Sequence, residues 1–426
     1  MSINDFLIPN FDQIRNSIRD IDDSYSNDWD ILAELCQNSV DAIRLAPSQE
    51  GKIQLFVDSP RRTISVTDDG IGIEPDDLPN LIKPFSTNKK SDKATIGEKG
   101  VGLTYAMFSG NYFEIISGTK NGASKGIVRN AYTWKISSED RAIPLDFQKI
   151  SEKIIGTQVT IREVVDSNLF NLNFNQLLFV IRTKTALGNT LGIWEEIKPI
   201  TVEITYIDNS GRTFHETVPN KYWLVSDNLK SNEVISLDEF ISYIQEADRS
   251  DIDKRKKLKD KVIINSSSFI NPSDNREIKF FACFVPNRNV WNQITVAEGI
   301  MTTDQIENDS YLENFGYSKF ISGITLSVKG MPTGIFVDHP STGFAGYWSN
   351  IFILFEDHEI KFDIGRKSIQ GRQATIYKKF AKVIFNDFLK YVSKYVAGDV
   401  SPDDQWDRDE VFAEVEGIIP LGNSKI

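Results

Sequence analysis

Cysteine and histidine are scarce in this sequence, and long apolar runs are absent. The chain has 2 cysteines and 3 histidines, and they form no cluster with the spacing of a zinc site. We therefore expect neither a structural metal centre nor a thiol nucleophile, and the isolated cysteines indicate a cytoplasmic protein. No apolar stretch approaches the ~20 residues that span a bilayer, and the N-terminal segment lacks the pattern of a signal peptide. We expect no membrane partner.

The composition is that of a globular, acidic protein. Hydrophobic residues make up 40% of the chain, charged residues 25%, and the net charge is −12. The length of 426 residues predicts two or three domains. The acidity argues against a surface coated with basic side chains for nucleic acid. One basic run, Lys254 to Lys259, is flanked by Asp251, Asp253 and Asp260, so we interpret it as a solvated helix or loop face.

The spacing of apolar residues predicts mixed helices and strands. Helices are predicted at 11–25, 29–45, 75–83, 171–187 and 372–396, and a further helix begins at 100–102. Strands are predicted at 52–58, 63–67, 112–118, 125–136, 157–163, 200–207, 213–218, 261–265, 278–286, 321–328, 334–338 and 350–356. The polar stretch 84–99 predicts a long mobile loop, and 225–260 is expected to be charged, helical and peripheral.

Four segments carry candidate chemistry, and the first lies on the predicted helix 29–45. Because residues four apart share a helix face, Glu34 and Asn38 point the same way, and Asp41 follows one turn later. A carboxylate that can take a proton from water then lies beside an amide oxygen that can bind Mg²⁺. Taken alone, the pattern is more typical of an ordinary solvated helix face.

The other three segments combine glycines with single polar residues. Asp68 ends a predicted strand, and Gly70 and Gly72 allow the chain to fold tightly beneath a flat ligand. The glycines in 97–102 free backbone N–H groups to approach phosphates at a helix N-terminus. No P-loop lysine and serine follow them. The fourth segment, 155–161, is a turn that opens a strand.

In this order and spacing, the four segments resemble the N, G1, G2 and G3 boxes of the GHKL ATPases, over about residues 25–165. That superfamily includes the ATPase subunit of DNA gyrase, the ninety-kilodalton heat-shock chaperones, sensor histidine kinases, MutL and the MORC ATPases. The resemblance implies an α+β protein that begins with a Bergerat fold, an α/β sandwich holding ATP between its sheet and helices.

The resemblance also implies roles for individual residues. Glu34 would be the base that activates water, and Asn38 would bind the Mg²⁺ of an Mg²⁺-dependent ATP hydrolase. Asp68 would accept a hydrogen bond from the adenine amine, supported by Thr157, and 84–99 would be the lid over ATP. Further nucleotide contacts are implied at Asp41, Gly70, Gly72, Lys89, Gly97, Lys99, Gly100, Val101 and Gly102.

The histidines argue against the kinase branch of this superfamily. His215, His339 and His358 all follow the ATP-binding segment, whereas the phospho-acceptor of a sensor kinase normally precedes it. A base at Glu34 also favours the branch that activates water.

The second half resembles an S5-like transducer domain. Its pattern is a strand, a turn and a strand over 323–337, followed by Asp363 to Lys367 before the long helix. Lys329, Arg366 and Lys367 are candidates to reach the γ-phosphate. The expected domains are 1–170 for ATP binding, 171–398 for the transducer with a charged insertion at 225–310, and 399–426 as a tail.

Together these features predict slow ATP hydrolysis that drives lid closure and, through a homodimer formed on ATP binding, gating. The first hypothesis is that the protein acts on DNA or within a defence or repair complex that has a separately encoded effector. The net charge of −12 weakens the hypothesis of DNA binding. The alternatives are a chaperone-like ATPase acting on protein clients and an ATP-sensing scaffold with little turnover.

Overall fold

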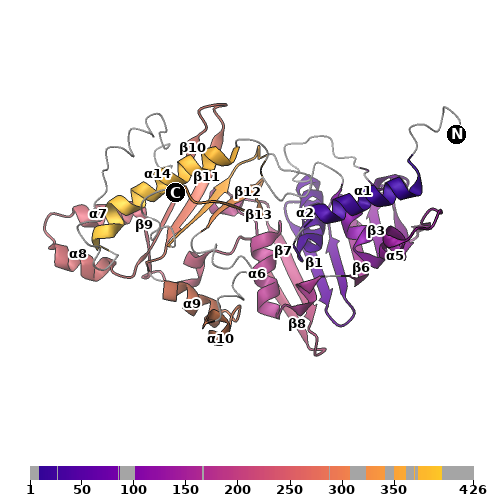
Figure 1. Cartoon of the computed structure of the whole chain (residues 1–426), viewed down its shortest axis with the longest axis horizontal. Helices are drawn as coiled ribbons and strands as arrows, with labels where there is room; N and C mark the ends of the chain where they lie inside the picture. The colour runs from indigo at the N-terminus through magenta and orange to yellow at the C-terminus, as the bar shows by residue number, and fades with distance from the viewer. Residues whose placement is uncertain are drawn as a thin grey trace.

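The molecule contains two β-sheets, each with helices packed on it, arranged one after the other along its long axis (Figure 1). The computed structural model describes residues 9–25, 27–84, 86, 101–165, 167–286, 288–307, 323–340, 350–360, 369 and 373–395. Among these residues, no helix combines the length and apolar character that a bilayer span needs.

The first sheet has 8 strands in the order β5-β4-β3-β6-β2-β1-β7-β8. Its strands are β1 (Gly51–Asp58), β2 (Thr63–Asp68), β3 (Gly110–Thr119), β4 (Gly122–Arg129), β5 (Leu145–Ile150), β6 (Gly156–Val164), β7 (Ile200–Ile207) and β8 (Thr213–Pro219). β1 and β7 pair in parallel, whereas β1 and β2 pair antiparallel. The sheet that carries the N-terminal segments therefore takes two strands from beyond residue 170.

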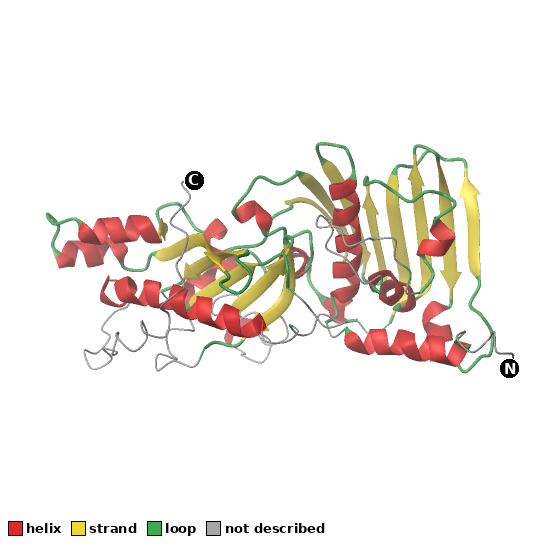
Figure 2. Ribbon diagram, turned by 90° about the horizontal axis from the view of Figure 1, so that it is seen from above, coloured by secondary structure: helices red, strands yellow, loops and turns green. Residues whose placement is uncertain are grey.

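Helices lie on one face of this sheet (Figure 2). They are α1 (Phe11–Ser24), α2 (Asp30–Leu45), α3 (Leu78–Leu81), α4 (Gly102–Phe108), α5 (Ala131–Ile136) and α6 (Phe174–Lys184), with the short 3-10 helix η2 (Asn168–Asn171). Two further 3-10 helices, η3 (Leu191–Ile193) and η4 (Val225–Asn228), pack in a cluster with strands of the second sheet. The first half is thus an α/β sandwich, as the sequence predicted.

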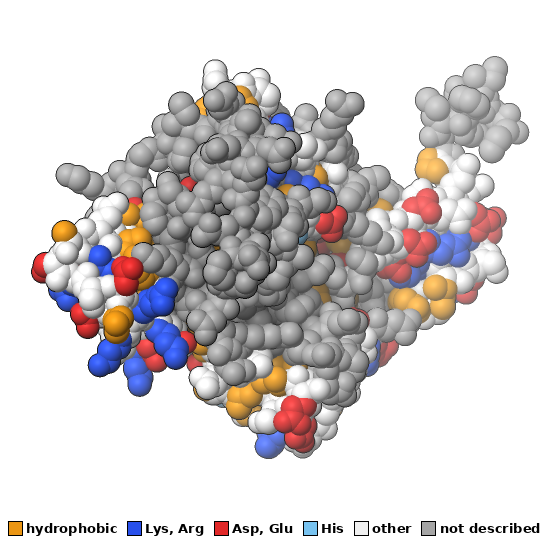
Figure 3. Space-filling model, turned by 60° about the vertical axis from the view of Figure 1, so that its left-hand side comes forward, with side chains coloured by type: hydrophobic (Ala, Val, Ile, Leu, Met, Phe, Trp, Pro, Cys, Tyr) orange, Lys and Arg blue, Asp and Glu red, His pale blue; other side chains and the backbone are white. Residues whose placement is uncertain are grey.

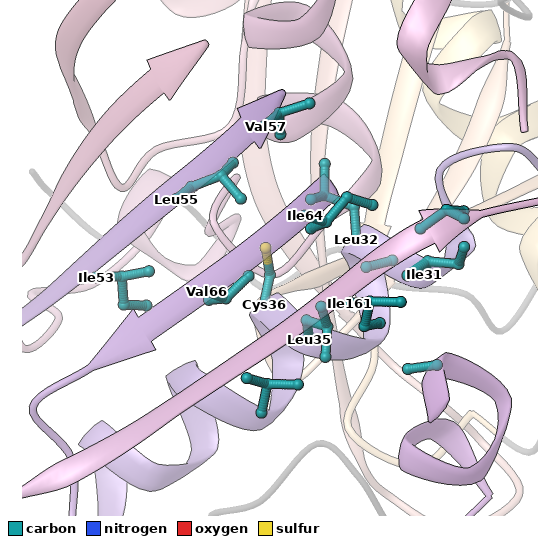
Figure 4. Packing of buried hydrophobic residues seen from close by; sticks show 14 of the residues in the cluster. Ile31, Leu32, Leu35, Cys36, Ile53, Leu55, Val57, Ile64, Val66 and Ile161 are labelled. Atoms are coloured by element: carbon teal, nitrogen blue, oxygen red, sulfur yellow. The ribbon is translucent and has the colours of Figure 1, made fainter. Parts of the chain in front are cut away.

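α2 is the central helix of the sandwich. Its apolar stripe packs on β1, β2 and β6, where Leu32 and Cys36 meet Val66 and Ile161 in one buried cluster (Figure 4). Each fully buried aliphatic side chain contributes roughly 1.5–3 kcal/mol. Burial also raises the pKa of the Cys36 thiol to about 12, so this cysteine is a packing residue rather than a nucleophile.

The second sheet has 6 strands in the order β13-β12-β14-β11-β10-β9. Its strands are β9 (Val234–Ser236), β10 (Val262–Ile270), β11 (Glu277–Phe284), β12 (Ile324–Val328), β13 (Met331–Val337) and β14 (Ile351–Glu356). The helices of this half are α7 (Leu237–Gln245), α8 (Asp251–Leu258), α9 (Arg288–Ala297), α10 (Thr303–Glu307) and α14 (Gln373–Tyr395). Phe380 and Phe388 of α14 bury fully against the sheet.

Two local predictions from the sequence are wrong. The strand predicted over 125–136 ends at Arg129, because Asn130 adopts a left-handed φ of 58° and the chain continues as α5. The basic run around α8 is only partly a solvated face. Lys254 is buried and donates to the carbonyl of Ile244 at 2.7 Å. Arg255, Lys256, Lys257 and Lys259 are exposed, and Figure 3 shows Lys and Arg side chains gathered on this side of the molecule.

Candidate functional site

Glu34 on α2 lies against the first residue of α4. The side chain is 6% exposed, and a Cβ added to Gly102 would lie 1.8 Å from Glu34 Oε2. The hydroxyl of Tyr25 donates to Glu34 Oε1 at 3.0 Å, and the ring of Tyr25 stacks on that of Tyr105 in α4 at 3.9 Å. The carboxylate is therefore held between a hydroxyl donor and a glycine, at the start of α4.

Asp68 provides a second buried carboxylate where β2 ends. It is 6% exposed, and the backbone N–H of Gly70 donates to its Oδ1 at 3.0 Å. Burial raises the pKa of Asp68 to about 6, against hydrogen bonds from Gly70, Ser39 and the backbone of Thr157 that lower it. At neutral pH the group is mainly ionised, so it can accept a hydrogen bond from a ligand amine.

The glycines after Asp68 are required by close contacts. A Cβ on Gly70 would lie 2.6 Å from the carbonyl carbon of Ala42 on α2, and Ile71 N–H donates to that same carbonyl oxygen at 3.1 Å. Gly72 has a left-handed φ of 67°, and a Cβ there would lie 2.0 Å from the Gly118 oxygen. The chain therefore packs directly on α2 at Gly70 and on β3 at Gly72, and neither position has room for a side chain.

Ser117, which the sequence did not single out, connects this loop to β6. Its hydroxyl lies 2.8 Å from that of Thr157, accepts from Ile73 N–H at 2.9 Å and reaches the carbonyl of Gly156 at 3.1 Å. In the sheet register, Thr157 pairs with Asp68 and Ser117 pairs with Thr157. Sequence reasoning could not find Ser117, because only strand register brings it to the site.

Ser39 and Tyr25 were missed for the same reason. Ser39 lies next to Asn38 in the chain, and its hydrogen bond to Asp68 appears only once α2 is docked on β2. Tyr25 precedes α2 and reaches Glu34 over the helix start.

Six predicted site residues lie on α2 or against it, namely Glu34, Asn38, Asp41, Asp68, Gly70 and Gly102. The role of every predicted site residue remains a prediction. On α2, Glu34 packs against Gly102, and Ser39 forms a hydrogen bond with Asp68. Asn38 is half-buried and lies between Glu34 and Ser39 in the sequence of the helix. Asp41 is 1% exposed, and its charge raises the pKa of Arg44 against the lowering caused by burial. Val101 is half-buried and is the N-cap residue of α4. Four predicted contacts, namely Lys89, Gly97, Lys99 and Gly100, lie outside the described residues, as do Arg366 and Lys367.

Asn38 is the residue that the sequence proposes as a Mg²⁺ ligand, and this role remains a prediction. In the part of the chain that the structure describes, no group of three or more His, Cys, Asp or Glu side chains is placed to hold a metal ion. Mg²⁺ in nucleotide sites is commonly bound by one or two protein oxygens together with phosphates and water. A single amide oxygen from Asn38 agrees with that pattern.

A separate hollow of about 630 Å³ lies on the opposite face of the first sheet. Strand alternation turns Gln54, Ser65, Thr160 and Glu203 to that face. The hollow contains neither Glu34 nor Asp68, so it is distinct from the group of residues around α2.

The N-terminal segment is similar to known proteins. Residues 25–161 match the family described as histidine kinase-, DNA gyrase B-, and HSP90-like ATPases. The chain is 29% identical to the chaperone protein HtpG of Campylobacter jejuni strain 81-176, and 28% identical to that of the subspecies doylei strain ATCC BAA-1458. Each match covers 32% of this chain and 25% of the relative, so the chain spans about a quarter of the length of the curated relatives it matches.

Proposed function

From the premise that residues 25–161 belong to the GHKL-type ATPases, we propose that this chain binds ATP around α2 and hydrolyses it slowly. The observation that carries the proposal is a pair of buried carboxylates at α2: Glu34, on the helix and against α4, and Asp68, at the end of β2 and hydrogen-bonded by Ser39 of the helix. One carboxylate suits a base for water and the other an acceptor for an amine, and a glycine lies beside each of them, Gly102 beside Glu34 and Gly70 beside Asp68.

Asp68 recognises adenine in this proposal. An ionised carboxylate in a desolvated position accepts the exocyclic amine strongly, and Thr157 and Ser117 hold its surroundings through their 2.8 Å contact. Gly70 and Gly72 let the segment after Asp68 pack directly on Ala42 and Gly118, since neither position has room for a Cβ.

Glu34 orients and deprotonates the attacking water, because a general base must first be positioned. Tyr25 donates to one oxygen of its carboxylate, and the other oxygen packs against Gly102, where a Cβ would not fit. Asn38 lies one helical turn further along and supplies the oxygen for Mg²⁺, which neutralises phosphate charge when bound. The predicted lid, 84–99, and the phosphate contacts at Lys89, Gly97, Lys99 and Gly100 complete the proposed site.

The test is an ATPase assay combined with calorimetric binding of Mg-ATP. Glu34→Gln is expected to keep affinity within about threefold and to lose at least about 100-fold in turnover. Glu203→Gln, on the opposite sheet face, is the matched control and should behave as the wild type. Unchanged turnover in Glu34→Gln would remove Glu34 from the mechanism.

For the target, we propose that closure on ATP forms a homodimer that acts on DNA. The supporting observation is the set of exposed cations Arg255, Lys256, Lys257 and Lys259 at and just after the end of α8. Four phosphate contacts would give a slope of log affinity against log salt of about −3.6. The double variant Lys256→Glu, Lys259→Glu should reduce this slope by about half. Sedimentation measured with and without an ATP analogue tests the dimer, which should form only with the analogue.

A chaperone-like role is the second candidate, because the relatives named HtpG are chaperone proteins. The match covers only a quarter of those relatives and coincides with the segment that matches the ATPase family. It therefore supports a shared ability to bind nucleotide more than an action on the same protein clients. Stimulation of ATPase turnover by an unfolded protein, without any effect of duplex DNA, would favour this second role. An ATP-sensing scaffold would bind Mg-ATP with negligible turnover in the same assay.

A further inference from the structure

One face of the first sheet carries a hollow of about 630 Å³. Within the described part of the chain, the helices that pack on this sheet lie on its other face (Figure 2). Most of the side chains that line the hollow are neutral and can both donate and accept hydrogen bonds. They include Gln54, Thr63, Ser65, Thr67, Gln158 and Thr160. A volume of this size is typical of a ligand site, and this lining suits polar, uncharged groups.

Phe56 on β1 places an aromatic ring among these polar side chains. It is half-buried, and strand register aligns it with Ser65 on β2 and then with Thr160 on β6. The hydroxyls of Ser65 and Thr160 lie 2.8 Å apart, and the two residues are 8% and 7% exposed. A flat ligand ring can therefore stack on Phe56 while its polar edge meets hydroxyls that are already fixed. A nucleobase has such a face and such an edge.

Three carboxylates lie in or beside the hollow and would repel an anionic ligand if their charges were unpaired. A lysine or an arginine holds each of them. The pairs are Asp58 with Arg61 at 3.2 Å, Glu203 with Lys52 at 2.6 Å, and Glu114 with Lys125 at 2.6 Å. Because these charges largely cancel, a net charge at the hollow has to come from further side chains.

Two arginines at the rim of the hollow flank one tyrosine ring. Tyr112 on β3 pairs in register with Arg129 on β4 and with Arg162 on β6, and Arg162 also lines the hollow. The guanidinium carbons of Arg129 and Arg162 lie 5.3 Å and 4.6 Å from the centroid of the Tyr112 ring. The hydroxyl of Tyr112 donates to Glu114 at 2.7 Å, which fixes the ring between the two arginines.

These two guanidinium groups supply the net positive charge beside the hollow. Both arginines are exposed. Among the residues that the structure describes, neither Arg129 nor Arg162 forms an ion pair with a carboxylate, although the charge of Arg162 acts on Glu114. Contact with the tyrosine ring restricts both side chains before any ligand binds, so less side-chain entropy is lost when they bind an anion. Phosphate is the anion that the planar guanidinium fork fits well.

We propose that this face of the first sheet binds single-stranded nucleic acid, with one base stacked on Phe56 and with phosphates on Arg162 and Arg129. Phe56 lies two strands from Arg162, and Arg162 lies two strands from Arg129, so each step across the sheet is about 10 Å. A few nucleotides span this path. Duplex DNA keeps its bases stacked on one another and cannot offer a base face to Phe56. The surface lies opposite Glu34 and Asp68 and apart from the cations of α8, so it goes beyond the proposed function.

Fluorescence anisotropy on the full chain tests the proposal, with a labelled single-stranded DNA of about 12 nucleotides and no ATP. The double variant Arg129→Met, Arg162→Met should bind at least about tenfold more weakly, and its slope of log affinity against log salt should be less steep by about 1.4. Phe56→Leu should bind about tenfold more weakly with an unchanged slope, because the stacked base is lost. An abasic strand of the same length should bind the wild type about tenfold more weakly, and Phe56→Leu should bind it as the wild type does.

A matched control separates the site from overall charge. The double variant Arg141→Met, Arg212→Met changes the net charge by the same amount, and its arginines are 76% and 75% exposed. Neither arginine lines the hollow, so this control should bind the strand as the wild type does. To locate the contact, strands that carry photoreactive iodouracil should cross-link to peptides that contain Phe56 or Tyr112.

The proposal would be overturned if the wild type did not bind the strand, if the two double variants bound it equally, or if the cross-links were confined to α8. Equal affinity for the abasic strand would also overturn it, because the bases would then make no contact. If Phe56→Leu does not fold, the arginine variants and the abasic strand still decide. Binding of Mg-ATP is measured separately by calorimetry, so a failure here leaves the proposed function standing.

Discussion

Glu34 packs directly against Gly102, so that a Cβ added to the glycine would lie 1.8 Å from the Oε2 atom of Glu34. The two residues come from different helices, α2 and α4. Their contact fixes where the Glu34 carboxylate lies, and it explains why a glycine occupies the first position of α4, where alanine would stabilise an isolated helix.

Gly102→Ala should displace the Glu34 carboxylate and lower ATPase turnover by about tenfold to 100-fold, because small misplacements of a reacting group are costly. Mg-ATP affinity should change much less. Gly192→Ala is the matched control, since its Cβ would meet Ile197 at an ordinary 3.5 Å. Equal turnover in the two variants would contradict the role of this contact.

Tyr25→Phe tests the other side of the same carboxylate. The hydroxyl that donates to Glu34 Oε1 at 3.0 Å is removed, while stacking on Tyr105 is retained. Turnover should fall by about threefold to tenfold with unchanged affinity, because the base loses one orienting hydrogen bond. Tyr112→Phe, which removes a hydrogen bond to Glu114 away from α2, should leave steady-state kinetics unaltered.

Asp68 should make the stability of the protein depend on pH in a defined direction. Its folded pKa of about 6 lies above the ordinary aspartate value of 3.8, so the folded protein holds this proton more tightly than the unfolded chain. The resulting stabilisation, about 3 kcal/mol, is fully present below pH 4 and is lost as the pH rises through 6. Denaturant titrations of Asp68→Asn and the wild type, compared from pH 4 to 7, should show this difference. If the free energies of unfolding of the two proteins differed by the same amount at every pH, this prediction would be refuted.

Ser39→Ala should move this transition to higher pH. The hydroxyl of Ser39 is one of the groups that lower the pKa of Asp68, and its loss should also reduce the free energy of unfolding at pH 7 by about 1 kcal/mol. Ser124→Ala is the control, because the buried Ser124 hydroxyl finds no hydrogen-bond partner among the described residues. A transition that stays at the same pH in Ser39→Ala would show that Ser39 does not act on Asp68.

The sequence predicted the parts of the fold that depend on periodicity. The helix over 29–45 and the strands around it follow from apolar spacing, and α2, β1 and β2 lie within a residue or two of the prediction. The predicted strand at 125–136 was wrong beyond Arg129, because the left-handed Asn130 gives no signal in an alternating pattern. The joining of β7 to β1 is a long-range pairing that no local pattern encodes.

The same limit applies to the candidate site. Glu34, Asn38 and Asp68 could be chosen from residue type and spacing because their family boxes are local in sequence. Tyr25, Ser39 and Ser117 act through contacts that exist only after α2 docks and β3, β6 and β2 align in register. The hydrogen bond from Arg44 to the carbonyl of Lys329 spans 285 positions, so only the folded chain reveals it.

The decisive experiment for ATP binding at α2 is a crystal structure of the chain with a non-hydrolysable ATP analogue and Mg²⁺. We expect the adenine amine within hydrogen-bond distance of the Asp68 carboxylate, and the γ-phosphate near Glu34 and the start of α4. An analogue bound elsewhere, for example in the hollow of about 630 Å³ on the opposite face of the sheet, with Asp68 and Glu34 untouched, would contradict it.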